Sequence, residues 1–159
     1  MTDILTDDQI KTLLAEPKTL PEELSGLTLP LRSVKLGHKE AQYDITGSSG
    51  NDFRIITRQN NFNAFDFSVI LAYLPPMTNQ VFRLRRYNGK SHEHTNRIES
   101  EKFYGFHIHI ATERYQRESE IEDGYAESTT RYGDLKGAIQ CLISDCGFLF
   151  PDRRQMSLF

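Results

Sequence analysis

The strongest constraint on the fold is a series of runs in which apolar and polar residues alternate, each bounded by a turn signal. A period of two residues is typical of a β-strand with one buried face. Gly47–Gly50 between two such runs predicts a hairpin, and Asn88-Gly89 marks another turn. Strands joined by short turns pair antiparallel. The expected strands are 31–37, 41–46, 52–58, 65–74, 80–87 and 103–111.

Helix signals flank these strands. Thr6 and Gln9 form a capping-box pattern, and an apolar stripe begins at Ile10. A second stripe over 134–146 ends at Gly147, which fits the residue just beyond a helix C-terminus. The intervening segment 114–127 is expected to be a charged loop.

The sequence therefore predicts an α+β fold, with an antiparallel β-meander of about five or six strands and an N-terminal and a C-terminal helix packed on one face. A chain of 159 residues suits one domain over 1–159. Its parts are a helical arm at 1–20, the sheet at 27–115 and the last helix at 130–147. No secretory signal and no run of about 18 apolar residues is present, so we expect a cytoplasmic protein without a membrane partner.

The charge is distributed unevenly along the chain. The net charge is −3, yet residues 31–97 carry ten Lys/Arg and five Asp/Glu. A moderately acidic total argues against a dedicated double-stranded DNA binder. The basic middle leaves room for a local anion site, although a mixed, solvated surface explains it equally well.

Four of the five histidines fall within 18 positions, as His92-Glu93-His94 and His107-Ile108-His109. An H-x-H pair in a strand sends both imidazoles to one face. If 80–87 pairs with 103–111, the side chains opposite Phe82 and Leu84 join them on that face. Those side chains are Arg83, Arg85 and Tyr87, and a register slip of one residue would remove them.

The first interpretation of this face is general acid–base cleavage of a phosphodiester without a metal or cofactor. Imidazoles titrate near neutrality, and arginines bind phosphate oxygens in pairs of hydrogen bonds. The predicted catalytic residues are His92, His94, His107 and His109, with Arg83 and Arg85 binding phosphate and Tyr87, Glu113 and Tyr115 in support.

Two alternatives use the same residues. The histidines can bind zinc or a similar ion, with Glu93, Glu113 or Asp123 completing the ligands, but nearby arginines would repel the ion. Alternatively they are solvent-exposed polar residues on the outer face of the sheet, with or without a non-catalytic binding role in which that basic face docks nucleic acid or an acidic partner. We rank the metal site third. His38 stands apart and is expected on the surface.

The stretch 82–115, FRLRRYNGKSHEHTN followed by FHIHIATERY, resembles the TumE-type toxins of bacterial toxin–antitoxin pairs. Such chains combine an antiparallel sheet, an R-Y-D/N-N/G strand end, a His-rich segment and a C-terminal helix. This chain is longer, adds an N-terminal helix and divides its histidines between two segments. The resemblance implies a toxin-like ribonuclease or nucleotide-modifying activity, with RNA as substrate and an antitoxin-like protein as partner. The matching residues are Arg86, Tyr87, Asn88, Gly89, His92, His94, His107 and His109.

Overall fold

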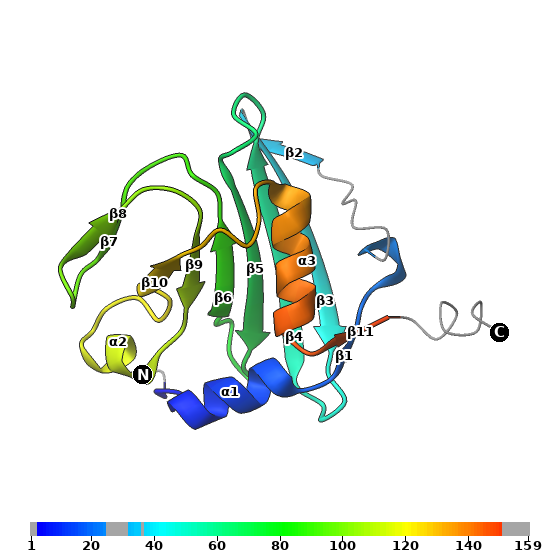
Figure 1. Cartoon of the computed structure of the whole chain (residues 1–159). Coiled ribbons are helices and arrows are strands. Elements are labelled where there is room, and N and C mark those ends of the chain that lie inside the picture. Colours follow the sequence, from blue (N-terminus) through cyan, green and yellow to red (C-terminus); the bar gives the residue numbers. More distant parts are fainter. Residues whose placement is uncertain (1–2, 25–31, 36, 151–159) are drawn as a thin grey trace.

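The computed structural model describes residues 3–24, 32–35 and 37–150. In this part of the chain a seven-stranded antiparallel sheet runs in the order β10-β9-β6-β5-β4-β3-β2, which confirms the predicted α+β meander (Figure 1). β10 is a strand that the sequence analysis did not predict. The strands are β2 (Arg32–Lys35), β3 (His38–Thr46), β4 (Asp52–Asn60), β5 (Phe67–Leu74), β6 (Phe82–Asn88), β9 (His107–Ile110) and β10 (Ala126–Ser128).

Both predicted terminal helices are present. α1 (Asp7–Ala15) begins with the Thr6–Gln9 capping box, and α3 (Leu135–Asp145) is capped by Asp134. α3 packs against β5 and β6. It runs roughly along the direction of the strands, and α1 runs along one end of the sheet (Figure 1). Their apolar stripes join the strand residues in one hydrophobic cluster. Of the helices described, none has the length and hydropathy that crossing a bilayer requires.

A buried lysine connects the ends of the two helices. Lys18 starts β1 (Lys18–Thr19), which pairs parallel with β11 (Phe148–Leu149). Its side chain is 0% exposed, and Nζ donates hydrogen bonds of 2.8–3.1 Å. A cation at helix C-terminal carbonyls is favourable, because those oxygens have no partner within the helix. The acceptors are the backbone oxygens of Leu13, Leu14, Glu16 and Cys146.

An irregularity in the β5–β6 pairing determines which arginines face which way. Leu71 pairs with Arg85 and Ala72 with Arg83, so Leu84 is an extra residue in β6. This β-bulge changes the alternation of side chains along the strand. Arg85 and Tyr87 consequently face α3, and Tyr87 donates a 2.6 Å hydrogen bond to Asp145.

The predicted placement of Arg85 and Tyr87 on the histidine face is therefore wrong. Arg83 is on that face, as predicted, and the second arginine there is Arg86, which pairs with His109 across β6 and β9.

The segment around β9 also differs from the prediction. The expected strand 103–111 is interrupted at Gly105, which has φ +102°, so that Phe103 belongs to a separate hairpin. That hairpin pairs β7 (His94–Asn96) with β8 (Glu101–Phe103). It is inserted in the chain between β6 and β9, which are neighbours in the main sheet (Figure 1). Glu113 begins α2 (Glu113–Arg117), and the expected loop 114–127 contains the rest of α2 and the start of β10. A single-turn 3₁₀ helix covers Glu22–Leu24.

Candidate metal centre

The two histidines of β9 lie on the face of the sheet opposite α3. His107 pairs with Asn88 and His109 with Arg86, whereas Ile108 pairs with Tyr87 on the helix-covered side. The pairing of β6 with β9 and the shared face of the two histidines are as predicted. Neither imidazole is exposed, however, because His107 retains 2% and His109 3% of its accessible surface. This contradicts the interpretation of these two residues as exposed polar groups.

The third histidine comes from the β7–β8 hairpin. The His94 ring stacks on that of His107 at 5.2 Å between centroids and meets that of His109 edge-on at 4.7 Å. One ring nitrogen from each residue lies within 4.8 Å of the other two. The chain thus gathers three imidazoles from two separate segments, and we refer to His94, His107 and His109 as the triad.

Each triad imidazole has one nitrogen hydrogen-bonded to a carbonyl oxygen. His107 Nδ1 lies 2.9 Å from Gly105 O, His109 Nδ1 lies 2.7 Å from Asp123 O, and His94 Nε2 lies 2.7 Å from Asn96 Oδ1. A carbonyl oxygen only accepts, so each of these nitrogens carries the hydrogen. In a neutral imidazole the second ring nitrogen then holds an unprotonated lone pair.

Two weaker contacts touch the same rings. Arg86 Nη2 lies 3.4 Å from His109 Nδ1, but both groups are donors, so the much shorter bond to Asp123 decides the tautomer. Asn88 Nδ2 lies 3.4 Å from His107 Nε2. That distance is long for a hydrogen bond and leaves this nitrogen weakly engaged.

Burial keeps the β9 imidazoles neutral. It lowers the pKa of His107 to about 4 and, together with the positive charge of Arg86, the pKa of His109 to about 2. Removing a charged imidazolium from water is unfavourable, so both residues are neutral at pH 7. A general acid must carry its proton at the working pH, whereas a metal ligand must not.

The arginines of this face are already paired with carboxylates. Asp123 is 0% exposed and lies 3.1 Å from Arg86 Nε and 3.6 Å from Arg83 Nε. Arg83 also binds Glu122 at 3.3 Å. On the other face, Arg85 Nη1 lies 3.9 Å from Asp145. The two arginines expected to bind phosphate, Arg83 and Arg85, are therefore engaged within the protein and do not share a face.

A pocket of about 290 Å³ opens over the triad. The exposed His92 and the adjacent Glu93 line this pocket, but His92 is not part of the triad. The His92 ring forms a hydrogen bond with the Ser91 hydroxyl. Tyr115 lines the pocket and donates a 2.6 Å hydrogen bond to Glu99. Glu113 is not among the lining residues and pairs with Arg117. The lining includes Arg86, Asn88, Arg97, Glu120, Ile121 and Gly124, which sequence reasoning did not assign to the site.

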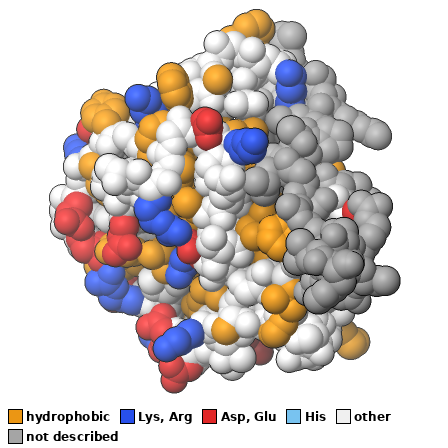
Figure 2. All heavy atoms as spheres, turned by 45° about the vertical axis from the view of Figure 1, so that its right-hand side comes forward, with side chains coloured by type: hydrophobic (Ala, Val, Ile, Leu, Met, Phe, Trp, Pro, Cys, Tyr) orange, Lys and Arg blue, Asp and Glu red, His pale blue; other side chains and the backbone are white. Residues whose placement is uncertain are grey.

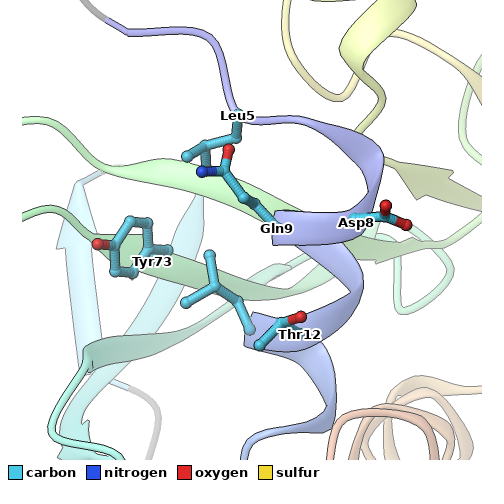
Figure 3. A pocket seen from close by; sticks show the side chains of 6 residues that line it. Leu5, Asp8, Gln9, Thr12 and Tyr73 are labelled. Atoms are coloured by element: carbon cyan, nitrogen blue, oxygen red, sulfur yellow. The ribbon is translucent and has the colours of Figure 1, made fainter.

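Other parts of the surface offer less chemistry. A pocket of about 320 Å³ between α1 and β5 is lined mainly by uncharged side chains such as Leu5, Gln9 and Tyr73, with Asp8 at its edge (Figure 3). On the face shown in Figure 2, acidic and basic side chains are interspersed with apolar ones. The triad pocket is the stronger candidate site.

Comparison with known proteins gave no match to a family model, to a curated protein or to a solved structure.

Proposed function

We propose that this protein binds a divalent transition-metal ion, zinc or one of similar ligand preference, through His94, His107 and His109. The observation that carries the proposal is the set of hydrogen bonds from each imidazole to a carbonyl oxygen. Histidines that bind metals nearly always donate the other ring N–H to such an oxygen, which orients the ring and fixes its tautomer. Imidazole ligands suit Zn, Cu, Ni and Fe.

The charges around the triad are compatible with a cation. From the sequence alone the neighbouring arginines make a metal site the least favoured of the three interpretations. Arg83 and Arg86 are balanced by Glu122 and the fully buried Asp123, which reduces their repulsion of an ion. Glu93 and Glu120 line the pocket and add negative charge at its wall. The positive charges of Arg83 and Arg86 are therefore compensated by adjacent carboxylates.

The spacing requires only a modest adjustment. Ligands of a tetrahedral ion at about 2.0–2.1 Å lie about 3.4 Å apart, compared with the separations of up to 4.8 Å found here. Closing these separations to tetrahedral spacing would require the nitrogens to approach one another by up to about 1.4 Å. Three protein ligands with a fourth position open to water are typical of catalytic zinc sites. An ion held by the triad would leave a position open to water and would make that water more acidic, and Glu93 and Glu120 in the pocket wall would be available to accept its proton.

Metal-independent RNA cleavage is the competing proposal. It is supported by a pocket lined by His92, Arg97 and Tyr115 beside the triad. It would use RNA as substrate and an antitoxin-like protein as partner in the cytoplasm, as the TumE-type resemblance implies. The low pKa of His107 and of His109 and the paired arginines favour the metal proposal over it.

Metal analysis separates the two proposals. We expect the purified protein, stripped of metal and titrated with zinc, to bind about one ion per chain. His107→Ala and His109→Ala should each abolish stoichiometric binding. His92→Ala is the matched control, because His92 lines the same pocket outside the triad. Failure of the folded wild type to bind zinc, cobalt or nickel would refute the metal proposal, and cleavage of an RNA pool that persists in EDTA would favour the competing one.

A further inference from the structure

Asn96 is a buried amide that contacts both the triad and the edge of the main sheet. It ends β7, and its residue is 2% exposed. Its Nδ2 donates to Ala126 O at 2.8 Å, and its Oδ1 accepts from Ala126 N at 2.9 Å. The same Oδ1 lies 2.7 Å from His94 Nε2. The side chain therefore pairs with the outer edge of β10 and holds the hairpin histidine.

The orientation of this amide is determined by its backbone partner. The Ala126 carbonyl only accepts and the Ala126 N–H only donates. Rotating the amide of Asn96 by 180° would place two acceptors opposite each other and two donors opposite each other, in a site without access to water. Leaving buried groups unpaired in this way is costly. Asn96 Oδ1 must therefore point toward His94.

The orientation of Asn96 in turn decides the tautomer of His94. Because Oδ1 is an acceptor, His94 must carry its hydrogen on Nε2, and its lone pair is on Nδ1. The two histidines of β9 have the opposite tautomer, since the backbone oxygens of Gly105 and Asp123 accept hydrogens from their Nδ1 atoms. Their lone pairs are on Nε2. The triad thus combines two tautomers.

The contact between Asn96 and Ala126 also connects the β7–β8 hairpin to the histidines of β9. Ala126 is the direct cross-strand partner of His109 in the β9–β10 pairing. Two hydrogen bonds join Ala126 to Asn96, and a third joins Asn96 to His94. The position of His94 relative to His109 is therefore set through three consecutive backbone and amide contacts.

We infer that Asn96 is a positioning residue for the metal site, which binds the ion through Nδ1 of His94 and Nε2 of His107 and His109. This inference rests on the proposed metal-binding function. It assigns the ligand atom of each histidine and identifies Asn96 as the group that selects Nδ1 in His94, whereas the other two histidines use Nε2.

Nitrogen-15 NMR tests the tautomers before any metal is added. We expect long-range ¹H–¹⁵N spectra of the metal-free protein to show His94 protonated at Nε2 and His107 and His109 protonated at Nδ1. After loading with ¹¹³Cd, scalar coupling should appear at Nδ1 of His94 and at Nε2 of the other two. An Nδ1–H tautomer of His94, or cadmium coupled to its Nε2, would overturn the inference. The expected tautomers without cadmium binding would instead refute the proposed function and the ligand assignment with it.

Two substitutions distinguish positioning from structural support. Asn96→Asp keeps an acceptor for His94 but loses the donor to Ala126, whereas Asn96→Ala loses both. We expect Asn96→Ala to weaken cadmium binding by about 10–100-fold, the usual effect of removing such a partner. Asn96→Asp places an acceptor opposite Ala126 O and should lower the free energy of unfolding, but its Oδ1 still accepts from His94, so in the folded protein it should weaken cadmium binding less than Asn96→Ala does. Lys102→Ala, an exposed change in the same hairpin, should leave affinity unchanged. Equal affinity losses in the two folded Asn96 variants would overturn the positioning role.

Discussion

His109 donates its Nδ1 hydrogen to the backbone oxygen of Asp123 at 2.7 Å, and the side chain of that same aspartate lies 3.1 Å from Arg86 Nε. One buried residue thereby orients an imidazole with its backbone and neutralises the nearest cation with its side chain. The arrangement makes the neutral, lone-pair-bearing form of His109 compatible with an arginine across the strand. Both the stability of the fold and the affinity for a metal should therefore depend on the Asp123 carboxylate.

Replacing Asp123 by Asn should destabilise the protein strongly. Removing one partner of a buried ion pair leaves an uncompensated charge, which costs about 3–5 kcal/mol. Arg86 would also repel a metal more strongly, so zinc affinity should fall. Urea unfolding and zinc titration measure the two effects. The matched control is Asp44→Asn, which breaks the exposed Asp44–Arg54 pair and should cost at most about 1 kcal/mol. Similar costs for the two variants would contradict the account.

The stability of the metal-free protein should fall as pH drops below about 6.5. The folded pKa of His107 is about 4 and that of His109 about 2, both below the ordinary value. Between pH 6.5 and 5 the unfolded chain therefore binds more protons than the folded one, and acid favours unfolding. Each histidine should contribute a slope of up to about 1.4 kcal/mol per pH unit.

Unfolding free energies measured at a series of pH values test this slope. His109→Asn should reduce it by about half, because the contribution of His109 is lost while that of His107 remains. Gln42→Ala, an exposed change on β3 that removes no titratable group, serves as the control and should leave it unaltered. A slope that His109→Asn leaves unchanged would argue against a buried neutral imidazole at that position.

Lys18→Met should lower the free energy of unfolding by about 1–3 kcal/mol, the cost of leaving buried polar groups unpaired. Four backbone oxygens at the ends of α1 and α3 would lose their shared donor. Chemical denaturation measures the loss. Lys11→Met, on the exposed side of α1, should change stability by less than about 0.5 kcal/mol. A loss no larger than that of the Lys11 variant would mean that the buried amine contributes little.

Arg85→Gln tests the β-bulge of β6. Because the bulge turns Arg85 toward α3 and Asp145, the substitution should reduce stability without changing zinc affinity. Arg86→Gln, one position along, should alter zinc affinity because Arg86 lies beside His109. The reverse outcome, with zinc affinity sensitive to residue 85 and not to 86, would show that β6 keeps a regular alternation.

The fold was largely predictable because its strands are long and alternate regularly. The hairpin at residues 47–50 and the pairing of β6 with β9 follow from period and turn residues alone. The bulge was not predictable, since the run Phe82-Arg83-Leu84-Arg85-Arg86 offers an arginine at either parity. Only pairing with β5 selects which one faces His109.

The candidate site was predictable in part. The H-x-H alternation identified His107 and His109, but it could not separate His92 from His94, because β7 is three residues long and too short to show a period. Asn96 follows His94 by two positions and shares its face, which is a signal that sequence reasoning left unused. Its importance depends on Ala126, which is 30 residues away in the chain.

The central claim is that the triad binds a metal, and anomalous X-ray scattering from crystals of the zinc-loaded protein tests it most directly. The account predicts one strong anomalous peak per chain at the zinc edge, at about 2.0–2.1 Å from Nδ1 of His94 and from Nε2 of His107 and His109. Electron density for the triad without an anomalous peak, or a peak located only at His38 or His92, would contradict it.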